Sequence, residues 1–249
     1  MQVSPSAIGQ DLDLPPLYSL VALREVGDAH AHACAIAENR GAGTLVWVRR
    51  YDLVEFAVVL EPEEPLAEAW RAIYAGSNAL ADALIAHAPP KCPVQVDWPD
   101  AILVDGVLVG GARLGWPDGV GNDEVPSWLV LSGMVRARAV RAAEPGSRPY
   151  RGALDELGFK EIDSGRIIES FARHLLHGFH DWQDGGYAEA ARHWTERFAP
   201  PKGLHARLDD NGDLLQFREA DQPPVERREL TTALATPSWL DPATRTPWL

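Results

Sequence analysis

The alternation of apolar and polar residues predicts a chain in which helices and strands are mixed. Asp28 has the character of an N-cap, and the helical pattern that it starts continues to about Asn39. The next two apolar runs, residues 43–50 and 53–62, are joined by only two residues, and the second run predicts a central, buried strand. Residues 65–88 carry apolar side chains at helical spacing and predict a long amphipathic helix.

The second half of the chain continues with further strands and two more helices. Its predicted strands are residues 92–98, 101–105, 107–116 and 127–140, and its predicted helices are residues 163–183 and 186–198. Asp105-Gly106 has the composition of a β-hairpin turn between two of these strands. The sequence APPKG at 199–203 ends the last helix and marks a boundary. Beyond it, three short strands are predicted at residues 203–209, 213–219 and 227–234.

These elements predict an α+β fold, a mixed sheet that carries helices on one face and is followed by a small β module. We expect a flexible N-terminal arm at residues 1–16, a main domain at 17–199, and a C-terminal module with its tail at 200–249. The tail is rich in proline and contains Trp239 and Trp248, which either clasp the body or hang free.

Composition and charge narrow the class of protein. The chain has 249 residues, of which 46% are hydrophobic and 24% charged, so a sizeable core is expected. The formal net charge of −13 argues against general nucleic-acid binding. No apolar run has the length of a membrane helix, and the N-terminus lacks the pattern of a secretory signal. With only two cysteines, the chain is expected in the reducing cytoplasm.

The stretch DWPDAILVDGVLVGG, residues 97–111, joins a tryptophan, a proline and a carboxylate to the predicted hairpin. Together with the order of elements around it, this stretch resembles the biotin–lipoate protein ligase family, in which a Lys-Trp-Pro-Asn-Asp run opens the same hairpin. The matching positions are Trp98, Pro99, Ile102, Leu103, Val104, Asp105 and Gly106. The last strands are similar to the small SH3-like module that closes biotin ligases.

The resemblance implies a two-step reaction in which ATP activates biotin, lipoate or a medium-chain acid as an acyl-adenylate. The acyl group then passes to a lysine on a carrier domain. ATP with Mg²⁺, biotin or lipoate, and a biotinyl or lipoyl carrier domain are therefore the expected cofactors and partners. Such chemistry requires cations where negative charge builds up.

The sequence departs from the family at the charged positions. The catalytic lysine of the family corresponds to Leu108, which carries no charge and cannot donate a hydrogen bond. The lysine before the tryptophan corresponds to Asp97, and the paired Asn-Asp becomes Asp100-Ala101. Arg113 lies on the strand of Leu108, but at a spacing of five residues it is expected on the opposite face.

Other family segments are also altered. The long Gly/Arg-rich loop corresponds to the short Arg49-Arg50-Tyr51-Asp52 connection or, in a second register, to residues 40–43. The Ser-Thr-Asn run at the start of the first helix corresponds to Asp28-Ala29-His30, and the Gly-Ile-Gly-Asn strand end to Ser132-Gly133-Met134. The catalytic residues thus stay unassigned. The candidate ligand-binding residues are Arg49, Arg50, Trp98, Asp100, Gly110 and Gly111.

Histidines and cysteines offer alternatives. His30 and His32 are two residues apart and do not share a helix face, so lining of the pocket mouth is favoured over a metal pair. The three histidines His174, His177 and His180 have a better spacing for metal, but a solvated helix face is the default, and no metal is expected. Cys92 is a candidate nucleophile for acyl transfer.

Two main hypotheses and one further alternative follow. The first is a divergent ligase-like protein that binds a biotin, lipoyl or medium-chain acyl group, its activity left open by Leu108 and the short loop. The second is a non-catalytic protein that keeps the fold for ligand binding or partner docking. The further alternative is an acyltransferase that acts through Cys92.

Overall fold

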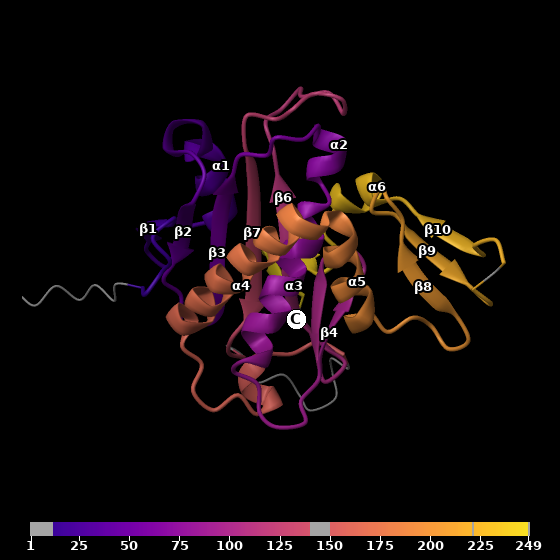
Figure 1. Ribbon diagram of the computed structural model, residues 1–249. Coiled ribbons are helices and arrows are strands. Elements are labelled where there is room, and N and C mark those ends of the chain that lie inside the picture. Colours follow the sequence, from indigo (N-terminus) through magenta and orange to yellow (C-terminus); the bar gives the residue numbers. More distant parts are fainter. Residues whose placement is uncertain (1–11, 140–149, 221, 249) are drawn as a thin grey trace, which may run out of the picture.

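A large mixed sheet forms the centre of the protein (Figure 1). The computed structural model describes residues 12–139, 150–220 and 222–248. The sheet order is β1-β2-β3-β7-β6-β5-β4, and β1 pairs with β2 in parallel while the other neighbours are antiparallel. Its strands are β1 (Ser19–Leu23), β2 (Thr44–Val48), β3 (Leu53–Leu60), β4 (Val94–Asp97), β5 (Ala101–Val104), β6 (Val107–Gly115) and β7 (Leu129–Arg136). The predicted mixed α+β fold is therefore confirmed, and β1 is a strand that the apolar pattern did not reveal.

The helices lie on both faces of this sheet. They are α1 (Ala29–Arg40), α2 (Leu66–Ala69), α3 (Ala72–Ile85), the 3-10 helix η1 (Leu154–Leu157), α4 (Ser164–Gly185), α5 (Tyr187–Arg197) and α6 (Leu230–Leu234). Helices α3 and α4 pack on one face, which we call the α3 face, whereas α1 packs on the other, the α1 face. The expectation of helices on one face thus holds for α3 and α4 and not for α1.

Helix α1 is held against the sheet by small side chains. Asp28 caps its N-terminus by accepting the Ala31 N–H, as predicted. Ala29, Ala33 and Ala37 recur every fourth residue and are buried against β2, β3 and β7. Because alanine is short, the helix axis lies close to the strands, and polar residues near its N-terminus come near the sheet.

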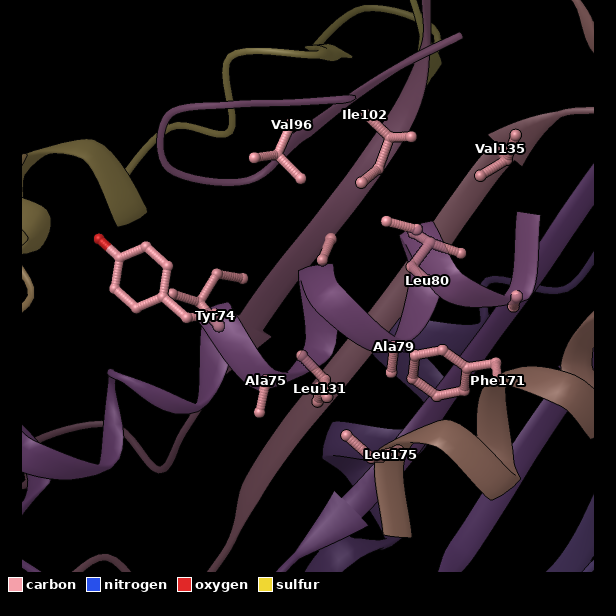
Figure 2. Packing of buried hydrophobic residues seen from close by; sticks show 14 of the residues in the cluster. Tyr74, Ala75, Ala79, Leu80, Val96, Ile102, Leu131, Val135, Phe171 and Leu175 are labelled. Carbon is pink, nitrogen blue, oxygen red and sulfur yellow. The ribbon is translucent and has the colours of Figure 1, made fainter. Parts of the chain in front are cut away.

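The main core fills the space between the α3 face and its helices (Figure 2). Figure 2 shows Ala79 of α3 beside Phe171 of α4, whereas Tyr74 lies toward the other end of α3 and points away from α4. Helix α3 comes so close to the sheet that a Cβ added to Gly76 would lie 2.4 Å from a methyl carbon of Leu131. The predicted long helix at 65–88 is interrupted by a tight turn between α2 and α3, where the Ile73 N–H bonds to the carbonyl three residues before it.

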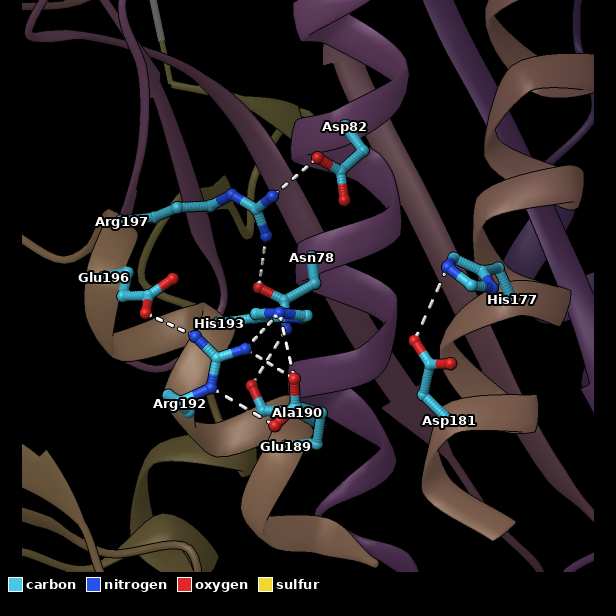
Figure 3. Close-up of polar contacts among 10 residues, drawn as sticks. All are labelled: Asn78, Asp82, His177, Asp181, Glu189, Ala190, Arg192, His193, Glu196 and Arg197. Atoms are coloured by element: carbon cyan, nitrogen blue, oxygen red, sulfur yellow. Dashed lines mark hydrogen bonds and ion pairs between the residues drawn. The ribbon is translucent and has the colours of Figure 1, made fainter. Parts of the chain in front are cut away.

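A polar cluster fixes α5 to α3 (Figure 3). Arg197 donates to Asn78 Oδ1 at 2.9 Å and to Asp82 Oδ1 at 2.6 Å. Asn78 in turn donates to the carbonyl of Ala190 at 2.9 Å. Without these bonds, the polar groups between the two helices would lack partners. The bonds therefore fix α5 relative to α3 and set the point at which the chain leaves α5.

The small sheet after α5 has the order β10-β9-β8 and contains β8 (His205–Leu208), β9 (Leu214–Phe217) and β10 (Glu226–Arg228). The small C-terminal β module is thus present. Its predicted third strand at 227–234 is correct only at its start, because the chain turns into α6 at Leu230. The Leu230 N–H bonds to the buried carboxylate of Asp213, which favours a helix start there.

Both ends of the described chain contact the body of the protein. The short strands β11 (Leu240–Asp241) and β12 (Thr246–Pro247) form a two-stranded sheet, and Trp239 before them is fully buried against the large sheet. The described residues after position 203 thus contain two small sheets, and the predicted boundaries between arm, main domain and C-terminal module stay predictions. Residues 1–11 of the predicted arm lie outside the described residues, but Asp13 pairs with Arg173 of α4. Among the residues that the structure describes, no helix is long and apolar enough to span a membrane.

Candidate functional site

The candidate site lies on the α1 face, where strands β3, β6 and β7 are covered by α1 at one end and by the C-terminal tail at the other. Its polar half is centred on His30 of α1. His30 Nδ1 lies 2.6 Å from Ser132 Oγ on β7, and its Nε2 lies 3.8 Å from Cys34 Sγ one helical turn later. The structure thereby brings together residues 28–30 and 132–134, which the resemblance matches to two separate family motifs.

The environment of His30 keeps its imidazole neutral at pH 7. Burial, followed by the positive charge of Arg113, lowers the pKa of His30 to about 4. Burial also raises the pKa of the neighbouring Cys34 thiol, so Cys34 stays protonated. The group can therefore exchange hydrogen bonds with a polar ligand, but it does not present an activated thiolate.

Charged residues surround this half-site. Arg113 donates to Asp28 at 3.3 Å, and Arg50 lies 3.7 Å from Glu55. Glu55 is only 2% exposed; its Oε1 accepts the Ala29 N–H at 2.9 Å, while its Oε2 has no hydrogen-bond partner. Burial raises the pKa of the Glu55 carboxyl. Acids and bases thus alternate around the half-site, which suits a ligand with both donors and acceptors.

A β-bulge changes the expected relation between Leu108 and Arg113. The register with β5 shifts between Ile102 and Leu103, so that Val109 is skipped in the pairing. Leu108 consequently packs on the α1 face, and Arg113 reaches Asp28 on that same face. The prediction of opposite faces is wrong, because strand alternation fails where one strand has an extra residue.

The other half of the site is apolar and filled by the chain itself. Trp239 is completely buried and forms a cluster with Leu53, Ala101 and Met134. Leu108, which the resemblance matches to the family lysine, packs against this cluster. The residues around the indole come from β3, β5, β6 and β7. We call the indole together with these residues the Trp239 site.

The two glycines of the motif have different roles. A Cβ on Gly111 would lie 2.3 Å from the Trp239 ring, so Gly111 is the backbone floor of the Trp239 site. A Cβ on Gly110 would instead lie 2.0 Å from the carbonyl oxygen of Met134, so Gly110 is required by the close approach of β7. Of the pair, the structure places Gly111 where a ligand could contact it.

Asp100 also lies at the Trp239 site. It is 1% exposed, its Oδ1 accepts a hydrogen bond of 3.2 Å from Ser238, and its Oδ2 has no hydrogen-bond partner. Burial raises the pKa of Asp100 to about 7, so both protonation states are populated at neutral pH. The carboxyl is bound to the tail and is not free to hold Mg²⁺ or a ribose in this arrangement.

Trp98 and Arg49 lie away from the α1 face. Trp98 belongs to the core on the α3 face, donates to Tyr74 Oη at 3.0 Å, and has the Arg228 guanidinium 4.6 Å from its ring centre. Its position links the body to the small sheet and does not support the predicted ligand contact. Arg49 stacks 5.1 Å from the ring of Trp47, which is also a core residue of the α3 face. Of the two predicted arginines, only Arg50 points to the site.

The remaining candidates do not converge on a site. Cys92 packs against the core of the α3 face, and its pKa is raised by burial and by Asp105, which disfavours a nucleophilic thiolate. His177 and His180 of α4 face the carboxylates one turn ahead at 3.6 and 3.8 Å on an exposed surface. Within the described ranges, no three residues of metal-binding type cluster.

Four residues of the site were not among its predicted members, namely Cys34, Glu55, Ser132 and Trp239; Ser132 and Trp239 were noted in the sequence, but not as site residues. Only Cys34 has a local signal, because it stands one helical turn after His30. The others enter through contacts between strands that are distant in sequence, and Trp239 lies in a tail whose position no periodic pattern specifies.

The fold and hairpin motif are those of the proteins that ligate biotin and lipoate. The model of the Biotin/lipoate A/B protein ligase family matches residues 14–196, and the chain belongs to this family. The family expectation from the hairpin is thereby confirmed. Comparison with curated protein sequences finds no match.

Solved structures support the same fold. A biotin protein ligase-like protein of unknown function from Silicibacter sp. TM1040 superposes with a TM-score of 0.76 at 28% identity, covering 91% of this chain and 100% of that chain. Biotin protein ligase from Aquifex aeolicus in complex with biotin and ATP gives a TM-score of 0.61 at 14% identity, covering 79% of this chain and 90% of that one. The Leishmania major enzyme in complex with biotin gives 0.54 at 13% identity, covering 81% and 94%.

The residues present do not fit ATP with Mg²⁺ in an adenylation reaction. Leu108 supplies no charge, Asp97 reverses one, and Arg49 is directed to the other face. Asp100, the one carboxylate kept in the hairpin motif, is buried against Ser238.

Proposed function

We propose that this protein is a non-adenylating member of its family that binds an acid or acyl group of the biotin and lipoate class. The observation that carries the proposal is the surroundings of Leu108, which packs with the apolar cluster around Trp239 where the reaction would need a cation. Removing one charge-stabilising donor costs about 10² to 10³ in rate, and here the lysine and most of the loop are missing together.

The polar half-site supports retention of binding. His30 and Ser132 offer a donor and an acceptor. Arg113 is paired with Asp28, and Arg50 with Asp52 and Glu55, so a ligand carboxylate would take the place of these partners. A biotinyl or lipoyl carrier domain is the expected partner, because it displays the same acyl group on a lysine. Binding in the cytoplasm to the free acid or to the loaded carrier, without transfer, is the proposed role.

Calorimetric titration of the full chain tests this proposal. The probes are biotin, lipoate and octanoate, each beside a stable acyl-adenylate analogue. We expect at least one free acid to bind, and its adenylate analogue to bind no more than about tenfold more tightly, because the cations for the phosphate are missing. ATP–pyrophosphate exchange should be absent.

Two results would contradict the proposal. An analogue that binds a hundredfold more tightly than its acid, or measurable pyrophosphate exchange, would show that the adenylation site works from other residues. Absence of heat with every acid and with a loaded carrier domain would exclude acyl binding by the full chain.

A further inference from the structure

The C-terminal tail inserts its first residues into the candidate site. The indole Nε1 of Trp239 donates to the carbonyl of Ala112 at 2.9 Å, and the ring lies over Gly111. Ser238 donates to Asp100 at 3.2 Å. Trp239 therefore satisfies a backbone acceptor of β6 and fills the apolar space above the glycine of the family motif.

The far end of the tail is held by a second contact. The buried Arg136 of β7 donates through Nη2 to Thr246 Oγ1 at 3.0 Å and to the Pro247 carbonyl at 2.7 Å. The Arg151 guanidinium lies 5.1 Å from the ring centre of Trp248. The tail is thus attached at its two ends.

Side chains of the body make these attachments. Among the residues that the structure describes, β11 and β12 pair with each other and not with a strand of the large sheet, and the turn between them at residues 242–245 is exposed. A two-stranded hairpin is at best marginally stable by itself, so its position depends on its packing against the large sheet, in which the buried Trp239 takes part. It can leave the sheet without breaking any hydrogen bond within the ladders of β5, β6 and β7.

We propose that the Trp239 site is a ligand site that the tail holds closed, with the indole standing where a ring-shaped ligand bearing an N–H donor binds. This inference rests on the proposed function and adds its regulation: ligand binding and tail docking exclude each other. A cyclic urea, as in biotin, has the N–H that would replace the bond from Trp239 to Ala112. Because the competent state is the open one, the measured affinity is reduced by the fraction of chains that are open.

Amide hydrogen exchange on the full chain is the first test. The reporters are the Trp248 N–H, bonded to Trp239 O at 3.0 Å, and the Arg245 N–H, bonded to Asp241 O at 2.8 Å. The reference is the Ala112 N–H on β6. We expect the reporters to exchange at least about tenfold faster than the reference without ligand, and faster still with saturating biotin. Equal rates, or reporters that biotin leaves unchanged although it binds, would overturn the proposal.

Calorimetry on Trp239→Leu is the second test, since leucine keeps an apolar side chain there but removes the ring and its N–H. We expect biotin to bind this variant at least about tenfold more tightly than the wild type. Trp116→Leu, which changes a tryptophan paired with Trp70 outside the site, is the matched control and should bind as the wild type does. Circular dichroism and thermal unfolding confirm that each variant is folded.

The outcomes separate this inference from the proposed function. Binding by wild type and Trp239→Leu with equal affinity leaves the proposed function intact and overturns the closed site. If only Trp239→Leu binds, the closed site is supported and acyl binding by the wild-type chain is contradicted. Binding by neither form overturns both.

Discussion

His30 Nδ1 of α1 and Ser132 Oγ of β7 lie 2.6 Å apart although 102 positions separate them in the chain. The contact joins the N-terminal turn of the helix on the α1 face to the central strand of the sheet. Because the imidazole is largely removed from solvent beside Arg113, its pKa is low and it is neutral, and a neutral imidazole can pair with a hydroxyl without bringing a charge into the core.

The neutral state of His30 predicts a loss of stability in acid. The pKa is lowered from an ordinary 6.5 to about 4 on folding, so the unfolded chain binds a proton that the folded chain refuses. The contribution of neutral His30 to stability is fully present above about pH 6.5 and falls as the pH decreases toward 4, by roughly 3 kcal/mol at about 1.4 kcal/mol per pKa unit. Urea unfolding at pH 7.5 and 4.5 measures this fall.

His30→Asn keeps a side chain that can bond to Ser132 and removes the titration. In this variant, we expect the difference in unfolding free energy between pH 7.5 and pH 4.5 to be smaller than in the wild type by most of the roughly 3 kcal/mol. His205→Asn changes an exposed histidine of β8 and is the control. If both variants lose stability in acid as the wild type does, the buried imidazole is not the cause.

The buried carboxyl of Asp100 predicts a loss of stability as the pH increases, opposite to the effect of His30. Its pKa rises from 3.8 to about 7 on burial, so ionisation becomes costly in the folded state between these values. The contribution of Asp100 to stability is greatest below pH 4 and is lost as the pH increases to 7 and above. Asp100→Asn, which retains an acceptor for Ser238, should gain on the order of 2–4 kcal/mol over wild type at pH 8 and little at pH 4. Asp118→Asn, at an exposed loop, should show no such difference.

Restoring the family lysine should not restore the reaction. In Leu108→Lys an ammonium group enters the apolar cluster of Leu53, Met134 and Trp239, and we expect a loss of about 1–3 kcal/mol in unfolding free energy. Leu17→Lys, at a position 73% exposed, should change stability by less than about 0.5 kcal/mol. ATP–pyrophosphate exchange by Leu108→Lys should stay at background. Clear exchange would mean that the rest of the adenylation site is intact.

The backbone at Gly111 predicts a steric effect. A methyl group there would lie 2.3 Å from both the Asp100 carbonyl oxygen and the Trp239 ring. Gly111→Ala should therefore destabilise the protein by about 1–3 kcal/mol, measured by thermal or denaturant unfolding. Gly178→Ala is the matched control: nothing lies within 4 Å of its added methyl in the middle of α4, so it should stabilise by about 0.5–1 kcal/mol. Similar effects at the two glycines would contradict the close packing at Gly111.

Local patterns accounted for most elements of the fold. The cap at Asp28, the turn at Asp105-Gly106 and the helical spacing of α3 and α4 each act over a few residues, so their signals survive in a single sequence. The same holds for the motif around Trp98-Pro99, which identified the family. The side on which α1 packs was missed, because its small alanines give little amphipathic pattern.

That Leu108 carries no charge could be read from the sequence by itself, because residue type determines whether a position can carry a cation. Which residues surround Leu108 and Gly111 was decided only by the tertiary structure. A bulge near Leu103 brought Leu108 and Arg113 to one face, and the tail carried Trp239 over Gly111, more than a hundred residues away. Such contacts depend on strand register and on the packing of whole elements, and these follow from the free energy of the complete fold rather than from any local pattern.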